Sequence, residues 1–296
     1  MKYVITGGAG NISKPLAEKL LSAKHDVVVI GRNADNLKAL VDKGAIAAIG
    51  DVEDRNFLTS VFSGADAIYT MVPPNFNATN WKAYIGSIGA NYATAARAAG
   101  VKYIVNLSSV GADQPEGCGP VTGLHKAEQE LNTLEGTAIL HLRPGYFYNN
   151  LLASIPMVKN MQIIGSNFGG NDRSIVLSAP VDIAEAAAEV LLQLDFVGHS
   201  VKYLASDERL ASAIARTIGT AIGNSNLPWV CFTNHQMNEG LLAAGLPSEI
   251  ATNYVEMGAA IASGLLFEDF QKHRPAVFGK TTLEDFAQDF AQAYAG

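Results

Sequence analysis

Residues 4–13, Val-Ile-Thr-Gly-Gly-Ala-Gly-Asn-Ile-Ser, join a buried strand pattern to a helical pattern. A glycine-rich turn between a strand and a helix is the usual setting of a dinucleotide phosphate site. Gly7 permits the tight turn, Gly10 lets the backbone approach a pyrophosphate, and the helix offers free amide groups and the positive end of its dipole. An ordinary strand-to-helix turn is the alternative. The stretch predicts a phosphate loop built from Thr6, Gly7, Gly10, Asn11 and Ile12.

Ser13 stands where a third glycine usually lets the helix pack closely on the strand. Its side chain adds a Cβ and a hydroxyl, which tighten that packing but remove no phosphate donor. We therefore expect the loop to keep its function.

The first half of the chain alternates short apolar runs, rich in β-branched residues, with stretches of helical period. We expect strands at 2–6, 27–30, 45–49, 67–71, 103–107 and 138–142, and helices at 12–23, 34–42, 54–62, 77–99 and 122–134. This alternation predicts an α/β fold with a Rossmann-type, doubly wound parallel sheet and helices on both faces. The loops at residues 7, 31, 51, 72, 108 and 143 should ring one crevice at the carboxyl ends of the strands.

After Arg143 and Pro144, strand-like and helical stretches no longer alternate regularly. Strand-like runs at 175–177, 201–205 and 227–232 are mixed with helical stretches at 181–193, 208–221, 247–263 and 282–293. No linker rich in Pro, Gly or Ser separates the halves. We expect an NAD(P)-binding domain over residues 1–145, extended by elements of the second half. A smaller α+β substrate lobe, interleaved with it, should cover residues 146–296.

Composition excludes several classes of protein. The formal net charge of −7 leaves no basic surplus for a nucleic-acid backbone, so we expect no direct nucleic-acid partner. Cys118 and Cys231 lack metal-ligand spacing and read as free thiols, and the dispersed histidines predict no metal site. No leader pattern and no apolar run near the roughly 20 residues of a membrane span is evident. We expect a cytoplasmic monomer or homodimer with no membrane segment.

The ends of the second and third strands bear on the choice of cofactor. An acidic residue after the second strand would favour NAD, but Arg32 stands there and its guanidinium suits the extra phosphate of NADP. We therefore expect NADPH rather than NAD. Asp51 and Val52 follow the third strand, where they meet the adenine edge unless Asp51 only caps a helix.

The chain resembles the NmrA-like group of atypical short-chain dehydrogenases/reductases over nearly its whole length. The residues that carry the resemblance are Thr6-Gly7-Gly8-Ala9-Gly10, Gly31-Arg32-Asn33, Gly50-Asp51, the Gly-Val-Lys-Tyr-Ile-Val run at 100–105, Leu107-Ser108-Ser109, His125-Lys126-Ala127-Glu128 and Leu142-Arg143-Pro144-Gly145-Tyr146-Phe147. The resemblance implies NAD(P) binding and a small substrate lobe. Members of this group include quinone and dye reductases as well as redox-sensing regulators.

Related dehydrogenases use a Tyr-x-x-x-Lys pair on one helix, in which the lysine lowers the pKa of the phenol for proton transfer. Lys126 fits the lysine position, but Thr122 occupies the tyrosine position, and its hydroxyl is far less acidic. Lys126 can still hold the nicotinamide ribose, and Ser108 can face the crevice from the end of its strand. A solvated helix lysine and a polar turn residue are the respective alternatives. We expect His125, which points away from Lys126, to be structural.

Without a proton donor in the protein, the expected substrate is an acceptor that takes up hydride readily and is then protonated by water, such as a quinone-like or other conjugated molecule. Met71, Val72 and Pro73 should shield the nicotinamide, and Pro144 completes the expected cofactor contacts. Tyr146, Phe147 and Asn149 should bind a flat aromatic substrate, unless the aromatic residues only join the two lobes. These features predict an NAD(P)H-dependent oxidoreductase. A non-catalytic NADP sensor is the first alternative and a nucleotide-sugar epimerase, which also needs the missing tyrosine, is the second.

Overall fold

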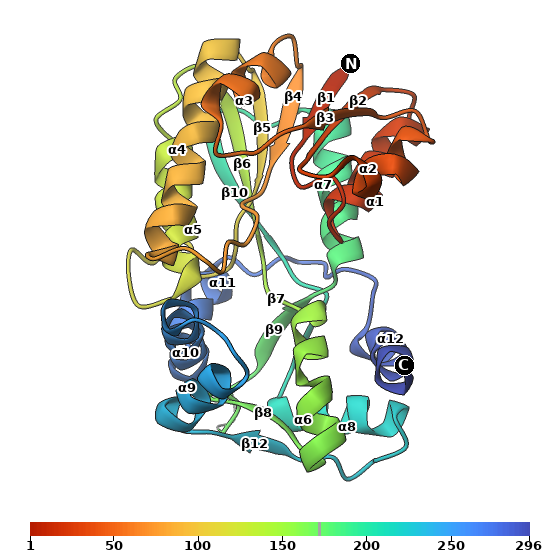
Figure 1. The fold of residues 1–296 in the computed structure, drawn as a ribbon, viewed down its shortest axis with the longest axis vertical. Coiled ribbons are helices and arrows are strands. Elements are labelled where there is room, and N and C mark those ends of the chain that lie inside the picture. The colour runs from red at the N-terminus through yellow and green to blue at the C-terminus, as the bar shows by residue number, and fades with distance from the viewer. Residues whose placement is uncertain (171–172) are drawn as a thin grey trace.

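The computed structural model describes residues 1–170 and 173–296. Within them, the larger half of the molecule is built on a seven-stranded, all-parallel sheet (Figure 1). The strand order β10-β6-β5-β4-β1-β2-β3 runs outward from β1 in both directions, which confirms the predicted Rossmann-type doubly wound sheet. The strands are β1 (Lys2–Ile5), β2 (Asp26–Gly31), β3 (Ile46–Ile49), β4 (Ala67–Thr70), β5 (Tyr103–Leu107), β6 (Ala138–Pro144) and β10 (His199–Leu204).

Helices cover both faces of this sheet because successive strand residues are apolar on opposite sides. Val4 and Ile68 are fully buried in one cluster, and Ile5 and Tyr69 in the other. Figure 1 places α3 (Arg55–Phe62), α4 (Trp81–Ala99) and α5 (Pro120–Leu131) on the first face. The second face carries α1 (Ser13–Ser22), α2 (Ala34–Val41) and α7 (Pro180–Gln193).

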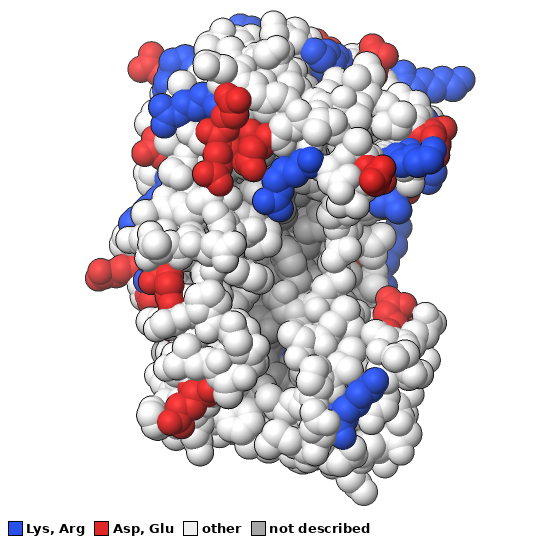
Figure 2. Space-filling view, viewed as in Figure 1, with Lys and Arg blue, Asp and Glu red and all other residues white. Residues whose placement is uncertain are grey.

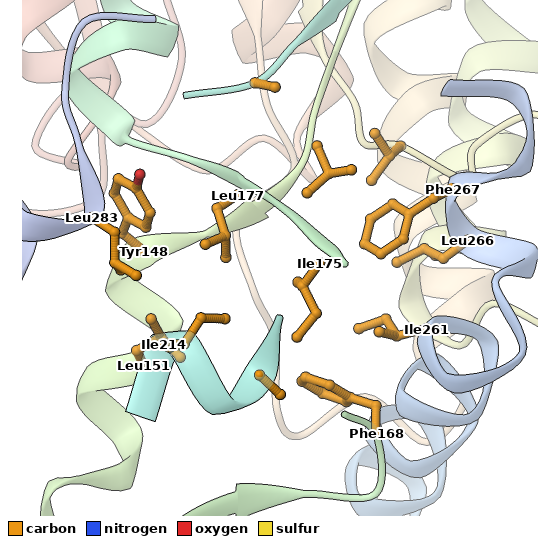
Figure 3. Packing of buried hydrophobic residues seen from close by; sticks show 14 of the residues in the cluster. Tyr148, Leu151, Phe168, Ile175, Leu177, Ile214, Ile261, Leu266, Phe267 and Leu283 are labelled. Atoms are coloured by element: carbon orange, nitrogen blue, oxygen red, sulfur yellow. The ribbon is translucent and has the colours of Figure 1, made fainter. Parts of the chain in front are cut away.

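The smaller lobe lies beyond the carboxyl ends of the parallel strands (Figure 1). One of its sheets contains β7 (Tyr146–Phe147), β9 (Ile175–Ser178) and β11 (Asp207–Arg209), and the other contains β8 (Ile164–Ser166) and β12 (Trp229–Cys231). Its helices are η1 (Tyr148–Ser154), α6 (Ile155–Met161), α8 (Ala211–Ala221), α9 (Asn234–Ala243), α10 (Ser248–Ser263), η2 (Leu265–Phe267), α11 (Glu268–Lys272) and α12 (Leu283–Ala295). Figure 3 shows Tyr148, Ile175, Leu177 and Phe267 in its core.

The chain passes between the two halves more than once. After β6 the chain enters the smaller lobe through β7. It returns to the large half as α7 and β10, and then enters the smaller lobe a second time. Helix α7 packs on α1, and β10 pairs in parallel with β6. The strand predicted at 201–205 is therefore an edge strand of the large sheet.

The second half departs from the predictions where its elements are short. The helix predicted from 208 is wrong at its start, because Asp207–Arg209 pairs antiparallel with Ile175–Leu177 and α8 begins only at Ala211. The pattern also did not predict the short elements β7, β8, α6 and α9. Strand β8 pairs with β12.

No described helix is by itself long and apolar enough to cross a bilayer, although α10 and the α11 region meet that length and composition together across a 73° bend. The described residues also contain no group of three His, Cys, Asp or Glu side chains arranged to hold a metal ion.

Candidate functional site

The loop between β1 and α1 has the backbone of a phosphate loop. Gly7 has φ +66°, and a Cβ on it would lie 2.7 Å from Met71 Sδ. The Gly10 N–H donates to the Gly7 carbonyl at 2.8 Å, and a Cβ on Gly10 would lie 3.2 Å from that oxygen. Both positions therefore favour glycine, the first because of its left-handed conformation and the second because of the close turn. Ser13 is buried beside Gly7.

The start of α1 presents unpaired donors. The backbone N–H groups of Asn11 and Ile12 have no acceptor in residues 1–170 or 173–296. No side chain caps the helix, and no acidic residue stands in its first turn. An anion would satisfy these amides and the helix dipole together, so the loop fits the pyrophosphate of a dinucleotide.

A cavity of about 310 Å³ lies over this loop and the ends of β2 and β3. Six residues expected to bind cofactor line it: Gly7, Gly10, Arg32, Asp51, Val52 and Pro73. The other expected cofactor residues do not line it: Thr6, Asn11, Ile12, Met71, Val72, Lys126 and Pro144. The cavity suits the adenosine half of a dinucleotide, and Asn36 and Leu37 of α2 add to its wall. The strand and loop pattern does not predict these two, because they lie inside a helix.

Charges of both signs stand at the mouth of this cavity. Arg32 is exposed and has no hydrogen bond or ion pair with a described residue. Burial, then the carboxylates of Glu53 and Asp51, raise the pKa of Tyr84 to about 12, and Arg32 opposes this shift. Asp51 also accepts a hydrogen bond from the Glu53 N–H at 3.0 Å, whereas Asp54 caps α3.

The segment after β4 is held in place by two buried polar side chains. Thr6 Oγ1 accepts from the Met71 N–H at 2.9 Å, and the Tyr92 hydroxyl donates to the Met71 carbonyl at 2.7 Å. Thr6 is therefore a support beneath the segment rather than part of the cavity wall. Val72 packs in the cluster of Trp81 and Ile250 between the two halves.

Ser108 and Pro144 meet at the carboxyl edge of the sheet. The Ser108 N–H donates to the Leu142 carbonyl at 2.8 Å, and the Val110 N–H donates to the Pro144 carbonyl at 3.0 Å. The Ser108 side chain is buried, yet its Oγ has no hydrogen-bond partner among the described residues. Buried hydroxyls are normally paired, so this one has bonding capacity left for a ligand.

Thr122 and Lys126 lie one turn apart on α5 but differ in environment. Thr122 is buried, and its Oγ1 accepts from the Cys118 N–H at 3.2 Å. Lys126 is exposed, and its Cβ faces Gly86 of α4. His125 Nδ1 lies 2.8 Å from the Ala112 carbonyl, a contact that ties α5 to the loop after β5.

A second cavity, of about 600 Å³, lies in the smaller lobe and includes Tyr146. Of the other predicted substrate residues, Phe147 packs against the core of the large half. Asn150, rather than Asn149, lines the cavity. Phe168, Trp229 and Met237 also line it, and sequence reasoning missed them because they come from separate segments without a local motif.

Comparisons with known proteins agree with this fold and with a dinucleotide-binding loop. Residues 7–191 match the model of a family described as NAD(P)H-binding. The chain is 27% identical over 282 residues to quinone oxidoreductase 2 of Escherichia coli K12, with 90% of each chain covered. The structure of the Escherichia coli NADPH-dependent quinone oxidoreductase complexed with NADPH has a TM-score of 0.81 at 24% identity, over 97% of this chain and 99% of that one. Triphenylmethane reductase of Citrobacter sp. has a TM-score of 0.77 at 21% identity, over 97% and 99%.

Proposed function

The chain belongs to the NAD(P)H-binding family, and from this we propose that it is an NADPH-dependent oxidoreductase that transfers hydride to a quinone-like or other conjugated acceptor. The observation that carries the proposal is the large cavity of the smaller lobe. Among the described residues, its lining contains Tyr146, Phe168, Trp229 and Phe232 but no charged side chain. Such a wall suits a flat, neutral aromatic acceptor.

Arg32 supports NADPH over NADH. Its guanidinium is exposed at the mouth of the cofactor cavity and is free to pair with a 2′-phosphate. The nearby carboxylates of Asp51 and Glu53 would repel a phosphate placed beside them. Arg32 would therefore decide where at the mouth the phosphate binds.

The cofactor supplies a hydride from its nicotinamide ring when bound. Around that ring, Met71, Val72 and Pro73 would exclude water, Pro144 would form part of the wall, and Lys126 would hold the ribose. The unpaired Ser108 hydroxyl can donate to an acceptor oxygen at the sheet edge.

The lack of an acidic hydroxyl on α5 limits the class of acceptor that can be reduced. Thr122 is bound to the Cys118 N–H and has no acidity to offer, so the acceptor's proton comes from water. A quinone that takes one hydride and one proton becomes a hydroquinone, and the first product, an oxygen anion, is stable enough to wait for the proton. A simple ketone would need the missing acid.

The same feature of α5 favours a non-catalytic NADP sensor as the second candidate. A nucleotide-sugar epimerase is supported least, because the substrate cavity has no cationic side chain for a diphosphate among its lining residues.

Oxidation of NADPH by the purified protein, with and without a panel of quinones, tests the proposal. We expect quinone-dependent oxidation in the wild type. Thr122→Val, which keeps the shape but removes the hydroxyl, should keep the wild-type kcat, because this residue is not an acid in the reaction. Binding of NADPH without turnover on any quinone would contradict the proposal and favour the sensor. A large fall in kcat for the variant would show that Thr122 takes part in proton transfer.

A further inference from the structure

The cavity of the smaller lobe is larger than a single ring requires. It lies between α6 and α9, above the two-stranded sheet of β8 and β12 (Figure 1). Its volume is about 600 Å³. The apolar part of its wall includes Met157, Met161, Phe168, Trp229, Met237 and Leu241.

The polar groups in this wall are mostly used inside the protein. Ser154 Oγ donates to the Leu151 carbonyl at 2.6 Å, Ser166 Oγ lies 3.4 Å from Asn167 Oδ1, and Gln236 Oε1 accepts from the Thr233 N–H at 2.9 Å. Tyr146 and Asn150 remain as polar side chains without a hydrogen bond in the described part of the chain. Most of the described lining therefore offers few free hydrogen-bonding groups to a polar ligand.

Helix α9 turns an apolar face toward the cavity. Met237, Gly240, Leu241 and Ala244 follow one another at helical spacing and all line it. No residue of α9 is buried. The helix is anchored at its start, by the Thr233–Gln236 capping box and by a 2.8 Å hydrogen bond from Asn167 to Asn234. The face that a core helix would bury in protein is thus left for a ligand to cover.

The Tyr146 end of the cavity lies near the carboxyl edge of the large sheet. Tyr146 lines the cavity and follows Pro144, at the carboxyl edge of the sheet, by two residues. Figure 2 shows a deep hollow that runs from the upper half of the molecule into the lower half, and few charged residues surround its lower part. A ligand can therefore place one end at the sheet edge and the other between α6 and α9.

On the basis of the proposed function, we propose that the space between α6 and α9 is a subsite for an aliphatic or isoprenoid tail on the acceptor ring. The ring lies at the Tyr146 end, beside the nicotinamide position, and the tail lies along the apolar face of α9. Three methionines in the wall, Met157, Met161 and Met237, have flexible unbranched side chains that adapt to such a tail.

The test is a series of benzoquinones that carry methyl, butyl, hexyl and decyl chains. In the wild type, kcat/KM should rise roughly three- to fourfold for each of the first methylenes that enter the subsite. Gly240 lines the cavity, and a Cβ there meets no atom within 4 Å, so Gly240→Phe has room to place a ring in the subsite. This variant should reduce the ratio of decyl to methyl activity to near one. Glu239→Phe is the matched control: its side chain is 64% exposed and it adds the same ring outside the cavity, so the wild-type ratio should remain.

A binding measurement that needs no turnover tests the tail subsite independently of the proposed reductase activity. Calorimetry with alkylated hydroquinone dimethyl ethers, which cannot be reduced, should show tighter binding as the chain lengthens, and Gly240→Phe should abolish the trend. Chain-dependent binding without quinone turnover would support the subsite and contradict the reductase. Turnover without any dependence on chain length would overturn the subsite and leave the reductase standing. An equal loss of the trend in Glu239→Phe would also overturn the subsite.

Discussion

Arg143 and Glu128 form a buried, two-pronged ion pair that joins the end of β6 to α5. Arg143 Nε lies 3.0 Å from Glu128 Oε1, and Nη2 lies 2.6 Å from Oε2. Arg143 Nη1 also donates to the Tyr203 hydroxyl of β10 at 2.9 Å. Burial alone would lower the pKa of Arg143, but the hydrogen bonds and charge of Glu128 outweigh it and raise that pKa. The pair thus fixes the helix of Lys126 against the strand of Pro144.

Glu128→Leu should lower the free energy of unfolding by about 3 kcal/mol or more, because it leaves a buried guanidinium without its main counter-charge. The double variant Glu128→Leu/Arg143→Met, which removes both charges, should regain much of that loss. Urea unfolding of the single and double variants at neutral pH measures both values. Additive losses would show that the two residues do not act as a pair.

Arg32→Ala should weaken NADPH binding about tenfold to a hundredfold and change NADH binding little, because a charge-assisted contact to the 2′-phosphate is lost. Calorimetric titration of both cofactors measures the change. Raising the salt should reduce the wild-type preference, since the contact is partly exposed. Lys38→Ala removes a nearby positive charge that pairs with Asp42 outside the cavity, and it should leave the preference unchanged. Equal losses for both cofactors would mean that Arg32 only supports its loop.

Ser108→Ala should lower the rate of quinone reduction without lowering the stability of the fold. Because the buried hydroxyl has no partner among the described residues, its removal should leave the free energy of unfolding unchanged or raise it by about 1 kcal/mol. Quinone reduction should fall roughly two- to tenfold, through the loss of one hydrogen bond. Thermal unfolding and steady-state kinetics on the same preparation give both results. A destabilised variant with unchanged kinetics would assign Ser108 to the fold alone.

His141 should make the protein less stable in mild acid. It is buried, with Nδ1 3.1 Å from Asn106 Nδ2 and Nε2 3.0 Å from Asn132 Oδ1, so the neutral ring accepts from one amide and donates to the other. Burial lowers its pKa from 6.5 to about 4. Between these two values the unfolded chain binds a proton that the folded protein does not, and the free energy of unfolding therefore falls as the pH falls.

The expected loss from His141 is up to about 3 kcal/mol across that window. Urea unfolding at a series of pH values measures it. Carboxyl groups also titrate toward the acid end, so His141→Gln, which cannot take up the proton, is the necessary comparison. The variant should show a shallower slope near pH 6, and equal slopes would mean that His141 already ionises normally in the folded state.

The sequence by itself predicted six strands of the large sheet and the glycine turn after β1, because each shows a pattern among residues that are close in the chain. Buried parallel strands need continuous apolar runs, and helices that cover them need a period near 3.6, so each element of the first half is visible locally. Gly7 and Gly10 are similarly predictable, since their backbone turn depends on residues beside them.

Only the tertiary structure decided the smaller lobe and its cavity. The three residues of β11 read as the start of a helix until β9 paired with them, and β8 is a strand because β12 lies beside it. The cavity wall combines Tyr146, Phe168, Trp229 and Met237, which no sequence spacing relates. Short elements have too few residues to show a period, and their conformation is set by partners far away in the chain.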